Sequence, residues 1–300
     1  MKLAFCFAGQ GSQYVGMGKD LYNEFPLAKK LYDQFPEIRD LCFYDSENVL
    51  NQTAYAQKAM LLTSYIIASI LKENGIEPEY VCGLSLGEYS ALAFSNVWSI
   101  EGSIDIITKR GMIMQNALPL GTTKMAAVLG MERDAILTVL KDIEGVCEIA
   151  NYNCPGQIVI TGELASVDMA MEKLSLAGAK RCIPLNVSGA FHSSLLNDAS
   201  KELRVKLDEF TPNNPLYKVI YNVSGREENS DVNDILQRQI CNSVYFEDSI
   251  KYLIDNGVDT FIEIGPGKTL SGFIKKVDRN ANVLVATDLA SVNEIIGGLK

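Results

Sequence analysis

A serine with the surroundings of a nucleophile lies within residues 81–90, in the pattern Gly83-Leu84-Ser85-Leu86-Gly87. The residues before it are typical of the end of a strand, and residues 88–94 follow with a helical pattern. At such a strand-to-helix turn the serine Oγ is exposed above the positive end of the helix. The glycines leave room where backbone passes close to the serine. This context favours a nucleophilic Ser85, and a purely structural turn is the alternative.

The chain contains a single histidine, His192, so a serine that needs an imidazole base has one candidate. It lies in the small-residue loop Gly189-Ala190-Phe191-His192-Ser193, next to an expected domain junction, where clefts form. The order of serine before histidine agrees with α/β-hydrolase-type sites, although spacing identifies no acidic third member. A structural or surface histidine is the alternative.

Arg110 lies on a predicted amphipathic helix over residues 99–117, at the edge of its apolar stripe. From that position its planar guanidinium can reach a cleft and hold a carboxylate through two parallel hydrogen bonds. An arginine that lies along the surface with its charge in solvent is the alternative. Arg110 is therefore a candidate carboxylate-binding residue.

Two glycine-rich turns follow predicted strands. Gly9-Gln10-Gly11 comes after the apolar run 3–8, at the edge where open α/β sheets bind ligands, but it lacks the third glycine of a dinucleotide-binding motif. Gly265-Pro266-Gly267-Lys268-Thr269 follows the predicted buried strand over residues 260–264 and is similar to a P-loop. Because Ile262 stands where that motif needs its leading glycine, we reject a nucleotide site there.

Bulk composition excludes several classes of protein. The chain has 300 residues, of which 47% are hydrophobic and 21% charged, as in an ordinary soluble enzyme. Its net charge of −10 argues against nucleic acid or an anionic membrane as a partner. The seven cysteines are an odd number without metal-ligand spacing, so we expect neither a disulfide framework nor a metal site. We expect no signal peptide and no membrane-spanning stretch, and hence a cytoplasmic protein.

The pattern of elements predicts an α/β fold with two units. Residues 3–8 are a continuous apolar run, typical of a strand buried on both faces of a parallel sheet, and residues 260–264 are predicted as a second buried strand. Residues 123–187 have the expected order strand, helix, strand, strand, helix, strand, which is the ferredoxin-like βαββαβ arrangement. We therefore predict an inserted ferredoxin-like subdomain over 123–187. The α/β-hydrolase-like core, with a mostly parallel sheet, would comprise residues 1–122 and 188–300. Further predicted elements are helices over residues 57–73, 194–210 and 234–244 and a strand over residues 217–223.

Several motifs occur together and in order along the whole chain. They are Phe7-Ala8-Gly9-Gln10-Gly11-Ser12-Gln13, Gly83-Leu84-Ser85-Leu86-Gly87-Glu88-Tyr89, Arg110-Gly111 with Met114, Asn151-Tyr152-Asn153-Cys154-Pro155-Gly156-Gln157, Gly189-Ala190-Phe191-His192-Ser193 and Glu263-Ile264-Gly265-Pro266-Gly267-Lys268. Each motif is weak alone, but the ordered series resembles the malonyl-CoA:acyl carrier protein transacylase family of type II fatty acid synthesis. One residue departs from the family pattern. Leu84 stands where the family usually has histidine, which bears on acyl-chain tolerance.

The resemblance implies a ping-pong acyl transfer between two thiols. Ser85 would attack the thioester of malonyl-CoA with His192 as general base, giving a malonyl-serine ester. The phosphopantetheine thiol of an acyl carrier protein would then take the malonyl group. The backbone N–H groups of Gln10 and Leu86 would form the oxyanion hole. No cofactor is implied, because the coenzyme A thioester is itself a substrate.

The remaining site residues are implied by the resemblance in the same way. Arg110, on a helix that also carries Met114, would bind the malonyl carboxylate, whereas an acetyl group would leave the buried charge unpaired. The backbone carbonyl of Gln239 would orient His192, where other enzymes use an aspartate. Phe191 would crowd out an α-methyl group on the substrate.

Three other functions stay open on the sequence alone. A serine esterase or thioesterase would use the same Ser85 and His192, although it has no need for a buried arginine. An acyltransferase of a polyketide pathway shares the chemistry and differs mainly in its carrier protein. A non-catalytic carrier-binding subunit is the third. For the transacylase we expect a monomer, with the acidic carrier protein docked on local basic residues such as Lys275 and Lys276.

Overall fold

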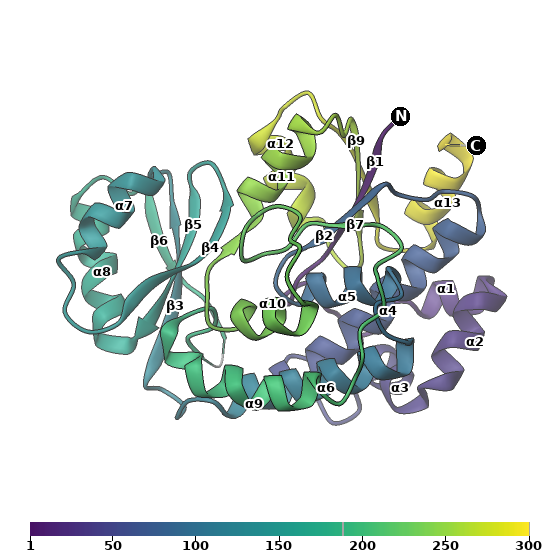
Figure 1. The fold of residues 1–300 in the computed structure, drawn as a ribbon, viewed down its shortest axis with the longest axis horizontal. Helices are drawn as coiled ribbons and strands as arrows, with labels where there is room; N and C mark the ends of the chain where they lie inside the picture. Colours follow the sequence, from purple (N-terminus) through teal and green to yellow (C-terminus); the bar gives the residue numbers. More distant parts are fainter. Residues whose placement is uncertain (188, 300) are drawn as a thin grey trace.

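The described chain forms two five-stranded sheets in a mixed α/β fold (Figure 1). The computed structural model describes residues 1–187 and 189–299, so Ser188, the predicted start of the second core segment, lies outside the described residues. The first sheet is parallel throughout and has the order β10 (Asn282–Ala286), β9 (Thr260–Ile264), β1 (Leu3–Phe7), β2 (Tyr80–Gly83) and β7 (Lys218–Val219). The second has the order β6 (Arg181–Pro184), β3 (Thr123–Leu129), β5 (Gln157–Glu163), β4 (Cys147–Cys154) and β8 (Val244–Tyr245).

The parallel sheet is buried on both faces, as its apolar strands predict. Side chains alternate along β1, so Phe5 and Phe7 lie in one hydrophobic core and Cys6 lies in the other. The first face is covered by α4 (Thr53–Glu73) and α5 (Leu86–Phe94), and α6 (Ile100–Asn116) packs on α4. The second face is covered by α11 (Phe246–Asp255) and α12 (Thr269–Val277). These layers fix the strand ends at which the candidate site lies.

Helix α4 has the length and apolar composition of a membrane span, although the sequence prediction found no such stretch. The structure explains its composition, because 78% of its apolar window is buried inside the protein. Leu62, Ile66 and Ile70 are among its fully buried residues in the main core. The helix ends at the predicted stop, where Gly75 has a φ of 81°. Helix α4 is therefore a core helix.

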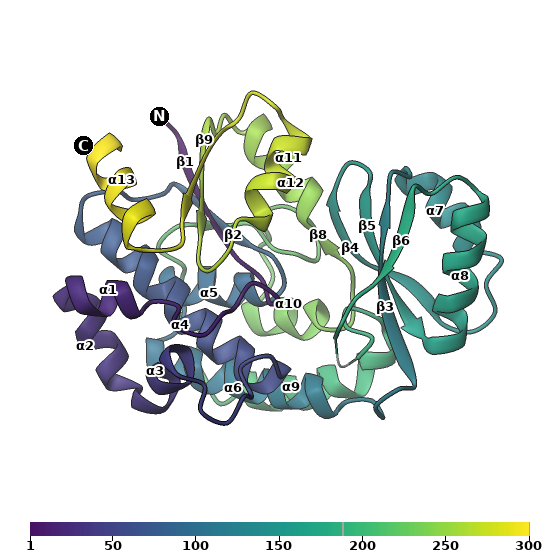
Figure 2. The ribbon, with the colours of Figure 1, turned by 180° about the vertical axis from the view of Figure 1, so that it is seen from behind.

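The second sheet belongs to a smaller unit that lies to one side of the parallel sheet (Figures 1 and 2). Its chain order is β3, α7 (Arg133–Leu140), β4, β5, α8 (Leu164–Leu176) and β6. One strand comes from outside the predicted range 123–187, because Val244 and Tyr245 of β8 pair in parallel with Asn151 and Tyr152 of β4. The predicted helix over 234–244 is therefore wrong at its C-terminal end, where the backbone joins a sheet instead.

The remaining helices surround these two units. They are α1 (Lys19–Glu24), α2 (Pro26–Gln34), α3 (Pro36–Phe43), the 3-10 turn η1 (Ser194–Leu196), α9 (Asn197–Leu207), α10 (Val232–Gln239) and α13 (Leu289–Leu299). Pro26 and Pro36 each occupy the first position of a helix, where a missing N–H costs no hydrogen bond. The predicted helix over 194–210 is thus the turn η1 followed by a shorter α9.

Candidate active site

Ser85 lies between the end of β2 and the start of α5, and its backbone has a φ of 54° and a ψ of −102°. The two glycines of the motif are required by close contacts. A Cβ on Gly83 would lie 2.1 Å from the carbonyl carbon of Gly87. A Cβ on Gly87 would lie 2.1 Å from the carbonyl oxygen of Phe7. The motif therefore forms the sharp strand-to-helix turn that its sequence predicts.

His192 lies directly against Ser85, although 107 residues separate them in the chain. Its Nε2 is 2.7 Å from Ser85 Oγ, and its Nδ1 is 2.9 Å from the carbonyl oxygen of Gln239. A carbonyl only accepts hydrogen bonds, so it favours a proton on Nδ1 and leaves Nε2 free to accept from the serine hydroxyl. This is the tautomer that a general base needs, and the predicted pairing of the three residues is present.

The surroundings of His192 keep its ring neutral. Burial is the largest cause, and the positive charge of Arg110 is the next, so the pKa of His192 is lowered to about 4. The hydrogen bond to the carbonyl of Gln239 acts in the opposite direction. At neutral pH the imidazole is therefore unprotonated and able to accept a proton.

Arg110 is completely buried, contrary to the solvated alternative. Its Nη1 donates to Gln57 Oε1 at 2.9 Å, and its Nη2 donates to Gln239 Oε1 at 3.0 Å and to Ser85 Oγ at 3.2 Å. Its guanidinium carbon lies 4.8 Å from the centre of the Tyr89 ring. Burial lowers the pKa of Arg110.

The charge of Arg110 lacks a counterion. Among the described residues the guanidinium of Arg110 forms hydrogen bonds to neutral side chains and no ion pair, and its Nε has no hydrogen-bond partner. The buried Glu88 is close enough to affect its pKa, but burial raises the pKa of Glu88 to about 8, so this carboxyl is mostly protonated at neutral pH. A buried cation held by neutral amides is prepared to receive an anionic group.

Gln57 is a member of the site that the sequence analysis placed only at the start of a predicted helix over residues 57–73. It is 1% exposed, holds Arg110, and places its Nε2 3.4 Å from Met114 Sδ and 3.5 Å from Gln10 Oε1. Gln10 also donates to Thr53 Oγ1 at 3.2 Å. The signal in the sequence was a polar amide on an otherwise apolar helix face, where a buried polar group needs partners.

The other predicted site residues lie in the same region. Leu86 is the first residue of α5, where the leading N–H groups of a helix have no partner within the helix. Met114 and Phe191 are buried in the main core. The side chain of Gln239, for which the sequence predicted no role, donates from Nε2 to the backbone carbonyl of Ser85 at 2.8 Å. Leu84 packs at the border of the second core.

Open space reaches this cluster from two sides. A cleft of about 570 Å³ runs between the smaller unit and the core and is lined by His192, Tyr152 and Leu140. A second space of about 570 Å³ is lined by Gln10 and Leu118. Either space is large enough for the arm of a thioester substrate.

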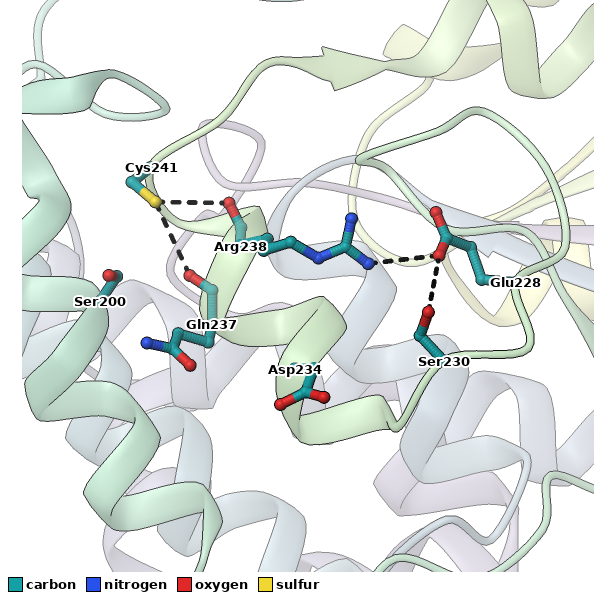
Figure 3. A pocket seen from close by; sticks show the side chains of 7 residues that line it. All are labelled: Ser200, Glu228, Ser230, Asp234, Gln237, Arg238 and Cys241. Atoms are coloured by element: carbon teal, nitrogen blue, oxygen red, sulfur yellow. Dashed lines mark hydrogen bonds and ion pairs between the residues drawn. The ribbon is translucent and has the colours of Figure 1, made fainter.

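A third cavity lies beside α10 and is a separate feature (Figure 3). It measures about 540 Å³ and includes the ion pair between Arg238 and Glu228, but it contains neither Ser85 nor Arg110. Cys241 lines both this cavity and the cleft at His192. Within the described residues no group of three or more acidic, cysteine or histidine side chains is arranged to hold a metal ion.

Comparison with known proteins gives matches over the whole chain. The acyl transferase domain matches residues 4–299. The malonyl CoA-acyl carrier protein transacylase of Bacillus subtilis (strain 168) is 43% identical over 309 residues, which cover 100% of this chain and 98% of that protein. The crystal structure of malonyl CoA-acyl carrier protein transacylase from Clostridium perfringens aligns with a TM-score of 0.97 at 40% identity, covering 100% and 97% of the two chains.

A further solved structure is a malonyl-transacylase in complex with its type II PKS acyl-carrier protein. It aligns with a TM-score of 0.95 at 32% identity and covers 99% of this chain and 100% of that one. The serine motif, the buried arginine and the full-length matches lead to one conclusion. The chain belongs to the acyl transferase family, among the malonyl CoA-acyl carrier protein transacylases.

Proposed function

We propose that the protein transfers a malonyl group from coenzyme A to the phosphopantetheine thiol of an acyl carrier protein, through a malonyl ester of Ser85. The relatives of this name support the substrate and the partner. The observation that carries the proposal is the buried Arg110, whose Nη2 lies 3.2 Å from Ser85 Oγ without a carboxylate partner. An enzyme for neutral acyl groups has no use for this charge.

In the first half-reaction Ser85 Oγ attacks the thioester carbon while its proton moves to His192 Nε2. The N–H groups of Gln10 and Leu86 would stabilise the negative oxygen of the tetrahedral intermediate. The C–S bond then breaks, and the leaving coenzyme A sulfur takes the proton from His192. The low pKa of His192 suits this second transfer, because a weakly basic ring gives its proton up readily.

In the second half-reaction the carrier thiol gives its proton to His192 Nε2 and attacks the ester carbon. The bond between that carbon and Ser85 Oγ breaks, and Oγ recovers the proton. The carbonyl of Gln239 holds the ring in place through both steps. Water competes with the carrier thiol for the ester, so a short-lived ester would make the protein a hydrolase instead.

Selection of the malonyl group would rest on three side chains. Arg110 would bind the carboxylate, Met114 would line the same pocket, and Phe191 would exclude a substituent on the α-carbon. Gln57 and the side chain of Gln239 would hold the guanidinium in position, since the side-chain oxygen of each accepts a hydrogen bond from it.

The proposal extends to the architecture and the setting of the enzyme. We describe residues 1–122 and 188–300 as an α/β-hydrolase-like core and residues 123–187 as a ferredoxin-like subdomain, supported by the strand order β6-β3-β5-β4. The enzyme would act as a cytoplasmic monomer with no cofactor and without nucleic acid or membrane as a partner. Lys275 and Lys276 are candidates for carrier docking, although Lys276 also donates to Gln157.

Incubation with malonyl-CoA followed by intact-mass measurement tests the proposal. A gain of one malonyl group, mapped to the peptide with Ser85 and absent in Ser85→Ala, is expected. Addition of acyl carrier protein should remove this mass and place it on the carrier. Release of free malonate faster than transfer would instead establish a thioesterase.

A polyketide acyltransferase is the second candidate, because one aligned structure is bound to a type II PKS carrier protein. Transfer rates to a fatty acid carrier and to a polyketide carrier, measured side by side, distinguish the two pathways.

A further inference from the structure

The side chain of Asn222 forms hydrogen bonds to the backbone of the two residues on either side of Leu84, one of which is Ser85. Its Oδ1 accepts from the N–H of Ser85 at 2.7 Å, and its Nδ2 donates to the carbonyl of Gly83 at 2.6 Å. Asn222 is 1% exposed and comes 137 residues after Ser85 in the chain. The sequence placed it within a strand over 217–223, but β7 ends at Val219.

This pair of hydrogen bonds reproduces the backbone pattern of a parallel sheet. A residue in such a sheet donates its N–H to the residue before its opposite neighbour and accepts from the residue after it. The side-chain amide of Asn222 does the same on either side of Leu84. Among the described residues, backbone hydrogen bonding at this edge of β2 ends at Val81, whose carbonyl accepts from the N–H of Ile220 at 2.9 Å. The side-chain amide of Asn222 therefore continues the hydrogen-bond ladder of β2 beyond the point where the backbone of the edge strand β7 pairs with it.

Asn222 is itself held from two directions. Its backbone N–H donates to Glu88 Oε2 at 2.6 Å, and its carbonyl accepts from the N–H of Tyr245 at 2.8 Å. Glu88 lies in the first turn of α5 and is fully buried. Asn222 thus connects the end of β2 to the helix that begins after Ser85, and both segments leave Ser85 little freedom.

Ser85 needs such restraint because its backbone has an unfavourable conformation. A φ of 54° with a ψ of −102° is rare for a residue with a side chain, and it persists only where neighbouring groups hold it. We propose that Asn222 is a positioning residue that keeps Ser85 Oγ in line with His192 Nε2. This inference rests on the proposed role of Ser85 as the nucleophile, and Asn222 does not contact the reacting atoms.

The test compares three variants in the full-length protein. Asn222→Ala removes both of these hydrogen bonds and a longer one, at 3.4 Å, that Asn222 Oδ1 accepts from Gln239 Nε2. Asn222→Asp keeps the acceptor for the N–H of Ser85 but sets an oxygen against the carbonyl of Gly83. Asn233→Ala is the matched control, because Asn233 is also a buried amide and donates to the carbonyl of Leu207 at 3.1 Å, away from Ser85.

Two rates are measured, together with the melting temperature. One is the rate constant for labelling of Ser85 by a neutral fluorophosphonate, and the other is kcat for malonyl transfer. Asn222→Ala should lower both on the order of 10²-fold, as expected for displacement of a reacting atom by about 1 Å. The KM for malonyl-CoA should change by less than about threefold, because Arg110 is untouched. Asn233→Ala should keep both rates at their wild-type values, even if its melting temperature falls.

Asn222→Asp adds a readout that a purely structural role would not change. Protonation of the new carboxyl restores a donor toward Gly83, so the labelling rate relative to wild type should rise as the pH falls from 8 to 5. This variant carries the test if Asn222→Ala does not fold. Wild-type rates in a folded Asn222→Ala, or equal losses in Asn233→Ala, would overturn the inference.

The fluorophosphonate separates this inference from the proposed function. If the wild type is labelled at Ser85 but does not transfer malonyl, the substrate assignment fails while the role of Asn222 is still measured. If the wild type is not labelled at all, Ser85 is no nucleophile and both proposals fall.

Discussion

Lowering the pH tests the environment of His192, because its pKa is lowered from 6.5 to about 4 by burial and by the charge of Arg110. At pH 5.5 an imidazole with a pKa of 6.5 would be only about 9% neutral, whereas one with a pKa of 4 would be about 97% neutral. The two cases therefore differ roughly tenfold in the amount of active base. We expect labelling of Ser85 to keep its full rate at pH 5.5.

The assay is the rate constant for labelling of Ser85 by the neutral fluorophosphonate between pH 3.5 and 8. A neutral reagent has no ionisation of its own in this range, so the profile reports the enzyme. Near-ultraviolet circular dichroism at each pH confirms that the protein stays folded. An inflection at pH 6 to 7 in folded protein would refute the reasoning, because the buried ring would then titrate like a free one.

The contribution of Arg110 can be separated in the same assay. Arg110→Met removes the second cause of the low pKa and leaves burial, the first, in place. The inflection should therefore move upward from about pH 4 without reaching 6.5. A malonyl carboxylate paired with Arg110 would act in the same direction, which would make His192 a stronger base once the acyl group is bound. An unchanged inflection in Arg110→Met would contradict this electrostatic link.

Further predictions concern selectivity, packing and a buried acid. Arg110→Ala should lower malonyl transfer on the order of 10²- to 10⁴-fold, since loss of one partner of a buried charge pair costs about 3–5 kcal/mol, and acetyl transfer should rise in relative terms. Unchanged selectivity in competition assays would exclude the clamp. Gly87→Ala should prevent stable folding because its Cβ meets the carbonyl of Phe7, whereas Gly272→Ala, in open space on α12, should raise stability by about 0.5–1 kcal/mol in urea titrations. The pKa of Glu88 is raised to about 8 from 4.5, so its contribution to stability is complete below pH 4.5 and is lost as the pH rises toward 8. Melting temperatures of Glu88→Gln should therefore fall less than those of wild type between pH 5 and 8, and parallel curves would count against this.

The sequence predicted the parts of the site that carry a local signature. Ser85 stands in a motif that is recognisable from five consecutive residues, although the structure explains Gly83 by a contact within the turn and Gly87 by a contact with Phe7 of β1. His192 could be found because no other histidine competes with it. The buried strand β1 was predictable because all five of its residues are apolar, as a strand covered on both faces favours, and β9 was predicted from a run that is apolar except at Thr260 and Glu263.

The residues that were missed depend on contacts between distant parts of the chain. Gln57 and Asn222 are amides whose partners lie 53 and 137 residues away, and an isolated amide has no local pattern. Strand β8 was missed because two residues are too few for an alternating pattern, and its partner β4 belongs to the other unit. The sequence shows that a polar group is present at such positions, but only tertiary packing decides what it bonds to.

Gln239 gives the last turn of α10 two tasks at once. Its carbonyl directs His192 at 2.9 Å, and its side-chain oxygen directs Arg110 at 3.0 Å. A displacement of α10 would therefore move His192, the base, and Arg110, the acyl-binding group, together. Replacement of the Gln239 side chain alone would leave the contact with His192 in place. Some substitutions would broaden the range of accepted acyl groups by moving this helix, and others would restore turnover. The two kinds of substitution should be coupled, so that the rate of a double variant is not the product of the two single effects. Substitutions that move this helix therefore change acyl selectivity and the turnover rate together.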